Sequence, residues 1–198
     1  SLGIAPDQRI LLYVGRLARE KNLETLFQAA ALACSDDPRL RLWLVGDGPH
    51  REACLEQVRA LGIGDRVRFV GFVPREEVDR YYAIADLFVF ASITETQGLV
   101  VQEAMSYGLP AVAVVGGGAS SSIENGVNGF VVKNEAFDFA DQILEVLDDD
   151  LTLARLSDGA RRSVRMYSTA HMTEKVVEVY RKAIGETLLD ERPSPVSA

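Results

Sequence analysis

Apolar runs of strand length alternate with segments of helical period through the first two thirds of this 198-residue chain. Five runs that are apolar along most of their length predict β-strands at residues 10–14, 40–45, 67–70, 87–90 and 111–115. Between them, apolar positions three and four apart predict helices near residues 23–30, 49–61, 76–84 and 99–107. Apolar strands that each lead into a helix are typical of a parallel sheet covered on both faces. The pattern therefore predicts an α/β fold with a doubly wound, Rossmann-like parallel sheet.

The last third of the chain is mainly helical in pattern. Three amphipathic faces predict extra carboxyl-terminal helices near residues 137–147, 153–164 and 176–184. Residues 190–198 contain two prolines and two serines and are expected to be disordered. A chain of this length suits one domain with a full core, which we expect to span residues 10–189.

The net charge of -8 argues against a nucleic-acid binder, which needs a basic face to meet phosphates. The acidic residues are spread along the chain, and only 148–150 form an acidic run. A solvated helix end explains this run better than a metal site, because no histidine or further carboxylate clusters with it.

Cysteine usage and apolar stretches indicate the compartment. Cys34 and Cys54 lie in helix-like segments among alanines and leucines, so we expect two free thiols that pack as small apolar groups. No apolar stretch reaches the roughly 18 residues of a membrane span. The first residues lack the basic flank and long apolar centre of a signal peptide. The default expectation is a cytoplasmic protein.

The most informative motif places two carboxylates, Glu95 and Glu103, on either side of Gly98. It follows the predicted strand at 87–90 and leads into the predicted helix at 99–107, so it lies on a strand-to-helix turn. Free backbone N–H groups and the helix dipole collect anions at such a turn, and the carboxylates can accept from hydroxyls on either side. A ligand with a phosphate between hydroxyl-bearing groups, such as a nucleotide sugar, suits this arrangement. The alternative is that a carboxylate at the start of the helix only interacts favourably with the helix dipole, which stabilises the helix by roughly 0.3 to 1 kcal/mol.

Arg16 and Lys21 follow the first predicted strand, with Gly15 at the turn. Two cations at the carboxyl end of a strand can converge on a diphosphate through charge-assisted hydrogen bonds. In isolation, two solvated cations on a surface loop are the favoured explanation. Arg16 directly follows a predicted buried strand, however, and this places it at the ligand edge of the sheet.

Two further loops follow the second and third strands. Gly46, Asp47 and Gly48 permit a tight turn and close approach to a flat ligand, although many αβ turns need no ligand to explain them. Phe72 and Val73 follow the third strand, where backbone groups could pair with a base.

Taken in order, these segments resemble the carboxyl-terminal half of the retaining GT-B glycosyltransferases of family 4. The resemblance covers about residues 10 to 185, and the ordered combination is more specific than any single motif. The matching segments are Val14-Gly-Arg16 with Lys21, Leu44-Val-Gly-Asp-Gly-Pro49, Val70-Gly-Phe-Val73, the pair Glu95 and Glu103, Glu103-Ala-Met-Ser-Tyr-Gly-Leu-Pro110, and Gly126-Val-Asn-Gly129.

The resemblance implies a nucleotide-sugar donor-binding domain and sugar transfer with retention at the anomeric carbon. Arg16 and Lys21 would hold the diphosphate, and Glu95 would contact a hydroxyl of the transferred sugar; these three are the expected catalytic residues. No metal is expected, because cations and helix-start amides would stabilise the charge that grows on the leaving diphosphate. The expected donor-binding residues are Gly15, Gly46, Asp47, Gly48, Phe72, Val73, Gly98, Leu99, Val100 and Glu103.

Within this set, the resemblance implies separate contacts for the parts of the nucleotide. The N–H groups of Gly98, Leu99 and Val100 would cap the diphosphate, and Glu103 would accept from the ribose hydroxyls. The backbone of Phe72 and Val73 would meet the base.

The chain departs from the family pattern at two places. Gln97 stands where many relatives carry an aromatic residue, and the residues 120–122 stand where relatives often carry a glutamate. The threonine and glutamine that precede Gly98 resemble the residues at this position in relatives that glycosylate lipids. This resemblance suggests that a full-length enzyme associates peripherally with the inner face of the membrane.

GT-B enzymes place the reaction between two Rossmann-like domains, and this chain holds one of them. Residues 1–9 are expected to be a remnant of the interdomain linker, and an amino-terminal acceptor domain would be the missing partner. The fragment alone is therefore expected to bind the donor without transferring sugar. Helix faces between 167 and 184 would then leave apolar surface uncovered.

Two other functions share this architecture. A GT-B-like nucleotide-sugar epimerase is disfavoured by Lys21 with the Glu95 and Glu103 pair, and a non-catalytic nucleotide-binding regulatory module predicts no convergence of these residues. A dehydrogenase and a P-loop enzyme are disfavoured because neither G-x-G-x-x-G after the first strand nor G-x-x-x-x-G-K-[ST] occurs.

Overall fold

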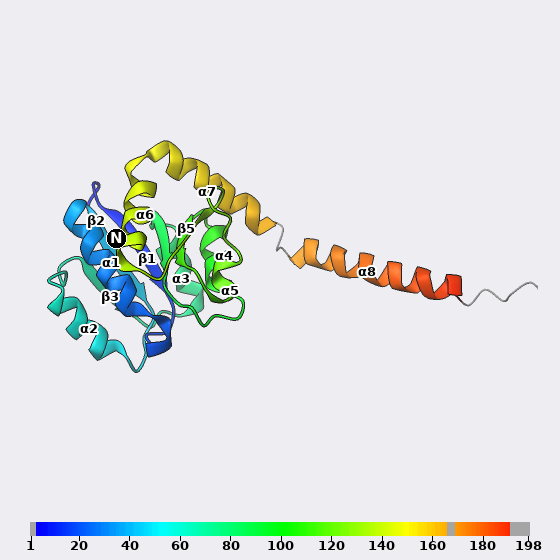
Figure 1. Ribbon diagram of the computed structural model, residues 1–198, viewed down its shortest axis with the longest axis horizontal. Helices are drawn as coiled ribbons and strands as arrows, with labels where there is room; N and C mark the ends of the chain where they lie inside the picture. Colours follow the sequence, from blue (N-terminus) through cyan, green and yellow to red (C-terminus); the bar gives the residue numbers. More distant parts are fainter. Residues whose placement is uncertain (1–2, 166–168, 191–198) are drawn as a thin grey trace, which may run out of the picture. The chain divides into compact units, whose positions relative to one another are not determined.

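A parallel sheet of six strands lies at the centre of the fold (Figure 1). The computed structural model describes residues 3–165 and 169–190. The strand order β3-β2-β1-β4-β5-β6 is that of a doubly wound sheet, so the predicted fold class is confirmed. All five strand pairs are parallel. The strands are β1 Arg9–Val14, β2 Leu40–Val45, β3 Val67–Gly71, β4 Leu87–Phe90, β5 Ala111–Val114 and β6 Gly129–Val132.

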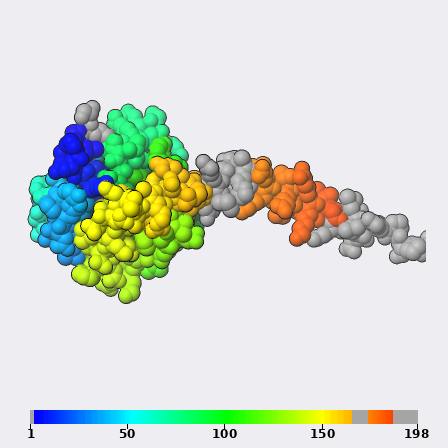
Figure 2. Space-filling view, turned by 90° about the horizontal axis from the view of Figure 1, so that it is seen from above, coloured from blue at the N-terminus to red at the C-terminus, as the bar shows by residue number. Residues whose placement is uncertain are grey.

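Helices connect the strands and extend the chain beyond the sheet. Helix α1 packs against α2 and α6, whereas α4 packs against α5 and against strands β4 and β5. Figure 2 shows α6 (yellow) on the surface beside the end of α1 (light blue). The helices are the 3-10 helix η1 Arg19–Lys21, α1 Leu23–Asp36, α2 Arg51–Ala60, α3 Arg75–Tyr82, α4 Leu99–Ser106, α5 Gly117–Ser120, α6 Ala136–Asp148, α7 Asp150–Arg165 and α8 Thr169–Asp190.

The central strands are buried along most of their length, which explains their apolar sequences. Every residue of β4 and β5 is buried, and Leu11 of β1 lies in register with Leu42 of β2 and Leu87 of β4. Cys34 and Cys54 are buried free thiols, as predicted. The core of the sheet therefore fixes the strand ends, and with them the loops that carry polar groups.

The sequence analysis missed strand β6. Its first residue is Gly129, and the three residues that follow are only partly buried, so the strand lacks a strong apolar signal. A Cβ atom on Gly129 would lie 2.0 Å from the carbonyl oxygen of Ala111, so pairing with β5 requires glycine here.

The structure divides into two compact units, residues 1–161 and 162–198. The second contains α8, on which large apolar side chains are exposed, as predicted for the part of 167–184 that the structure describes. These are Val176, Val177, Val179, Tyr180 and Ile184. Residues 191–198, for which disorder was predicted, and Tyr167 lie outside the described residues. In the described ranges, no helix is both long and apolar enough to cross a membrane.

Candidate functional site

The loops after β1, β2 and β3 are hydrogen-bonded to one another at the carboxyl edge of the sheet. The N–H of Gly15 donates to the carbonyl of Val45 at 2.9 Å, and the N–H of Gly46 donates to the carbonyl of Gly71 at 2.8 Å. A Cβ atom on Gly46 would lie 2.0 Å from the Gly15 carbonyl oxygen, so this approach requires glycine. Ligands of doubly wound sheets bind at this edge.

The predicted residues Lys21 and Glu95 meet at this edge as an ion pair between the Lys21 Nζ and Glu95 Oε1 atoms. Their side chains are only 18% and 24% exposed. The hydroxyl of Ser92 also donates to Glu95 Oε1, at 3.3 Å. One carboxylate oxygen thus accepts from two donors, which fixes the position of Glu95.

Arg16 lies on the same edge but is more open to solvent, because 63% of its side chain is exposed. Its guanidinium forms an ion pair with Glu20, four residues further on. The hydroxyl of buried Tyr13 donates to the Arg16 carbonyl at 3.1 Å and holds the backbone of the loop. Six of the predicted site residues line one cavity of about 350 Å³ together with residues of the strands and of α3: Gly15, Arg16, Gly46, Asp47, Phe72 and Val73.

Glu103 lies on α4 and lines a neighbouring cavity of about 470 Å³. Arg75 donates to Glu103 Oε1 at 3.0 Å, and the hydroxyl of Tyr82 donates to Oε2 at 3.4 Å. Burial raises the pKa of the Tyr82 hydroxyl, and the charge of Glu103 raises it further, so Tyr82 stays a donor. Phe72 and Val73 line both this cavity and the cavity of Arg16, so the two cavities are adjacent.

The turn before α4 provides free amide groups. Within the described ranges, the N–H groups of Gly98, Leu99 and Val100 donate to no protein acceptor. Gly98 is in the left-handed region with φ 60°, and a Cβ atom on it would lie 2.2 Å from the Cα of Ala119. The turn therefore requires glycine, and it presents N–H groups at the positive end of the helix dipole.

The glycine run 116–118 supports the loop that carries Glu95. The N–H of Gly118 donates to the Glu95 carbonyl at 2.5 Å, and a Cβ atom on Gly118 would lie 2.1 Å from the carbonyl oxygen of Thr96. Close backbone contact explains why side chains are absent there.

Sequence reasoning missed three side chains around Glu103: Arg75, Tyr82 and Tyr107. Tyr82 and Tyr107 are stacked, with ring centroids 5.2 Å apart, and both line the Glu103 cavity. Arg75 lies two residues after the recognised segment 70–73, and Tyr82 lies seven residues later on the same helical face. That spacing is the signal that could have identified them.

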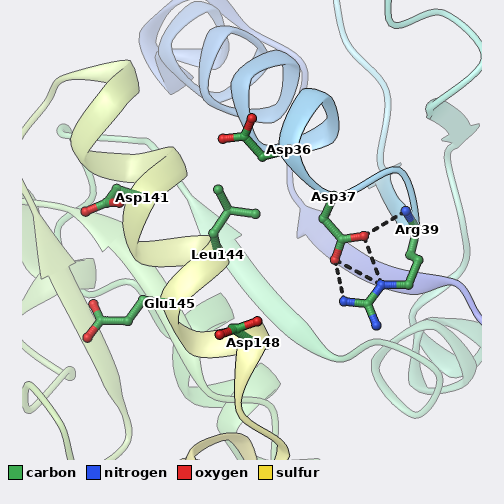
Figure 3. Close-up of a pocket in the computed structure, with 7 residues that line it drawn as sticks. All are labelled: Asp36, Asp37, Arg39, Asp141, Leu144, Glu145 and Asp148. Carbon is green, nitrogen blue, oxygen red and sulfur yellow. Dashed lines mark hydrogen bonds and ion pairs between the residues drawn. The ribbon is translucent and has the colours of Figure 1, made fainter.

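An acidic cavity of about 360 Å³ lies between the end of α1 and helix α6 (Figure 3). Helix α1 ends there and β2 begins, so the cavity is at the amino edge of the sheet, opposite Lys21 and Glu95. Arg39 forms an ion pair with Asp37 at 2.7 Å. Across the described ranges, no group of three or more acidic, histidine or cysteine side chains is arranged to hold a metal ion.

A doubly wound sheet with cations, carboxylates and free helix-start amides along its carboxyl edge has the architecture of a nucleotide-binding α/β domain. Comparison with known protein families identifies the family within this class. The family model described as glycosyl transferases group 1 matches residues 1–163, and the chain belongs to this family. It corresponds to the carboxyl-terminal, nucleotide-sugar donor-binding domain of a retaining GT-B glycosyltransferase, as the sequence resemblance implied.

The relatives agree with this assignment. The chain is 34% identical to the D-inositol 3-phosphate glycosyltransferase of Thermobispora bispora, over 100% of this chain and 48% of that protein. It is 32% identical to the alpha-monoglucosyldiacylglycerol synthase of Acholeplasma laidlawii, over 96% and 45% of the two chains. The structure of Anabaena HepE in complex with UDP matches with a TM-score of 0.81 and 28% identity, over 91% of this chain and 50% of that one. The chain thus spans about half the length of the relatives it matches.

Proposed function

We propose that this chain binds a nucleoside diphosphate sugar at the carboxyl edge of its sheet and forms the donor half of a glycosyltransferase that transfers a hexose to an acceptor hydroxyl. The observation that carries the proposal is the partly buried ion pair of Lys21 and Glu95 beside the free amides before α4. A cation, a carboxylate and unpaired N–H groups at one strand-to-helix turn suit a ligand that joins a phosphate to a sugar.

The diphosphate would lie between Arg16, Lys21 and the α4 turn. In this proposal the two cations form charge-assisted hydrogen bonds with its oxygens, and Gly98, Leu99 and Val100 donate their N–H groups. When the bond to the sugar breaks, negative charge grows on the leaving diphosphate. Groups already aimed at that charge stabilise the transition state more than the ground state, so Arg16 and Lys21 serve catalysis as well as binding.

The remaining contacts divide the nucleotide sugar into its parts. Glu95 accepts from a hydroxyl of the transferred sugar, and Glu103 accepts from the ribose hydroxyls. The backbone of Phe72 and Val73 contacts the base. Gly15, Gly46 and Asp47 line the adjoining cavity and form its wall in this proposal. Gly48 supports that wall through close packing, because a Cβ atom on it would lie 2.3 Å from the Leu17 carbonyl oxygen.

The relatives guide the choice of donor but not of acceptor. HepE, at 28% identity, was crystallised with UDP, so UDP is the first nucleotide to test. The two named curated relatives differ in their acceptors, one an inositol phosphate and one a lipid, by their names.

Because these relatives are about twice as long, we propose that acceptor binding needs an amino-terminal domain and that residues 1–198 alone transfer no sugar. A cytoplasmic location, with peripheral membrane association of the longer protein, stays a prediction.

Calorimetric titration with UDP, GDP and ADP tests donor binding directly. We expect one diphosphate to bind most tightly, and we expect Lys21→Ala and Glu103→Ala each to weaken it about tenfold or more, as loss of a charged hydrogen bond does. Arg59→Ala is the matched control and should bind as the parent does, because Arg59 is exposed in the last turn of α2, which leads to the amino end of β3. Equal, weak binding of all three nucleotides, unchanged by Lys21→Ala, would contradict the proposal and favour a regulatory module.

A further inference from the structure

Asn22 connects the segment that carries Lys21 to the strand end that leads to Glu95. Its Nδ2 atom donates to the carbonyl of Ala91 at 3.0 Å and to Oδ1 of Asn134 at 2.7 Å. Its own Oδ1 accepts from the hydroxyl of Thr25 at 3.1 Å. The side-chain amide thus uses both of its N–H groups and its oxygen, and it joins three separate segments of the chain.

The backbone of Asn22 is also specialised. Its φ is 53° and its ψ is 37°, which is the left-handed region. Among the residues that the structure describes, Asn22 alone has a positive φ without being glycine. Asparagine tolerates this conformation better than most residues. The turn passes the chain from the 3-10 helix that ends at Lys21 directly into α1, so the conformation of Asn22 sets the direction in which Lys21 leaves the sheet edge.

The side chain of Asn22 does not serve helix α1 in the usual way. An asparagine at the N-cap commonly accepts a hydrogen bond from an N–H group of the first turn, and Asn22 forms no such bond. Its amide instead reaches Ala91, which is fully buried and directly follows β4. The buried carbonyl of Ala91 therefore obtains its donor from the Lys21 segment.

A second contact between the same two segments supports this connection. The hydroxyl of Thr94 donates to the Glu20 carbonyl at 3.4 Å, on the other side of Lys21. The ion pair of Lys21 and Glu95 lies between this contact and the one made by Asn22. Lys21 is thus held to the Glu95 loop by the residues before and after it.

We propose that Asn22 is a positioning residue for the donor site: it touches no ligand, and it fixes Lys21 against the loop of Glu95 through the Ala91 carbonyl. The inference rests on the proposed donor function and assigns a residue that acts on it through Lys21. The expected consequence is that loss of the Asn22 amide weakens diphosphate binding only while Lys21 is present.

The variant Asn22→Gly tests this, because glycine keeps the left-handed backbone and removes the side chain with its amide. UDP affinity is measured by calorimetry for the parent, Asn22→Gly, Lys21→Ala and the double variant, with thermal unfolding to correct for the folded fraction. Asn134→Ala is the control, since it removes one neighbour of Asn22 but leaves the bond to Ala91.

We expect Asn22→Gly to weaken UDP binding by about tenfold in the parent and by less than about twofold in the Lys21→Ala background, as coupled residues do. Asn134→Ala should stay within about twofold of the parent. The inference is overturned if Asn22→Gly leaves affinity unchanged, or weakens it equally in both backgrounds, which would indicate a purely structural role. If the parent binds no nucleotide at all, the proposed function itself fails, and this outcome is distinct from the other two.

Discussion

The ammonium group of Lys21 and the carboxylate of Glu95 form an ion pair although the residues are 74 positions apart in sequence. Both belong to the predicted catalytic set, and each satisfies the other before any donor is bound. In the proposed function, a diphosphate would therefore compete with Glu95 for Lys21. Hydroxyls of a bound donor sugar would offer hydrogen-bond donors to Glu95, so the carboxylate would no longer need the ammonium group.

The first prediction follows from this competition. Glu95→Gln should tighten the binding of UDP by about threefold to tenfold, because Lys21 loses its competing carboxylate and a negative charge near the diphosphate disappears. The same change should remove most of any preference for UDP-glucose over UDP, because a carboxylate accepts more strongly from a sugar hydroxyl than an amide does. Calorimetry with both ligands measures the two effects.

Glu145→Gln is the matched control for this variant. Glu145 lines the acidic cavity at the amino edge of the sheet and is far from Lys21 in the topology, so UDP affinity should not change. Weaker binding of UDP by Glu95→Gln would show that Glu95 supports the diphosphate site instead of competing with it.

A second prediction concerns Gly98 and the α4 turn. Gly98→Ala should destabilise the protein clearly more than Gly62→Ala, although both glycines have a left-handed φ, of 60° and 71°. The backbone penalty of about 1 to 2 kcal/mol is common to both. Only Gly98 also meets another part of the chain, at 2.2 Å from the Cα of Ala119, whereas nothing lies within 4 Å of the Cβ position of Gly62.

Urea unfolding of both variants measures this difference. Gly98→Ala should in addition weaken UDP binding, since relief of the contact with Ala119 moves the free N–H groups of the turn. Equal losses of stability in the two variants would mean that α5 moves aside at no cost and that the close packing of the turn is unimportant.

The sequence alone was sufficient to predict the central strands, but it was insufficient to predict the edge strand β6. Strands such as β4 and β5 are buried on both faces, so their apolar runs predict them without knowledge of their neighbours. β6 is partly exposed and begins at Gly129, whose role depends on the backbone of Ala111. Such a contact between distant segments leaves no local pattern.

The same limit applies to the site. Arg16, Lys21 and Glu95 could be located because they follow strand ends, and parallel strands bring their carboxyl ends to one edge. The pairing of Arg75 with Glu103 and that of Asn22 with Ala91 join residues 28 and 69 positions apart, and their partners become identifiable only in the folded chain. The direct roles of the predicted residues toward a donor stay predictions.

The last prediction concerns stability at alkaline pH. Burial raises the pKa of the Cys34 thiol from an ordinary value of 9.0 to about 11, although Arg66 and Arg41 oppose the shift. Between these values the unfolded chain has lost this proton and the folded chain retains it, so stability falls as the pH rises. The contribution is fully present below about pH 9, and its loss amounts to about 1.4 kcal/mol per pH unit up to about pH 11.

Cys34→Ala should therefore lower stability at neutral pH, where it leaves a small cavity, but should make the alkaline decline shallower. Urea unfolding at about pH 8 and about pH 10.5 gives the fall in unfolding free energy for the parent and for Cys34→Ala. The difference between these two falls isolates the effect of Cys34, because both proteins contain the other buried groups. Tyr13 and Cys54, whose pKa values burial also raises, contribute equally to both slopes. Parallel slopes would mean that the thiol reaches solvent before it titrates, through local opening of the end of α1.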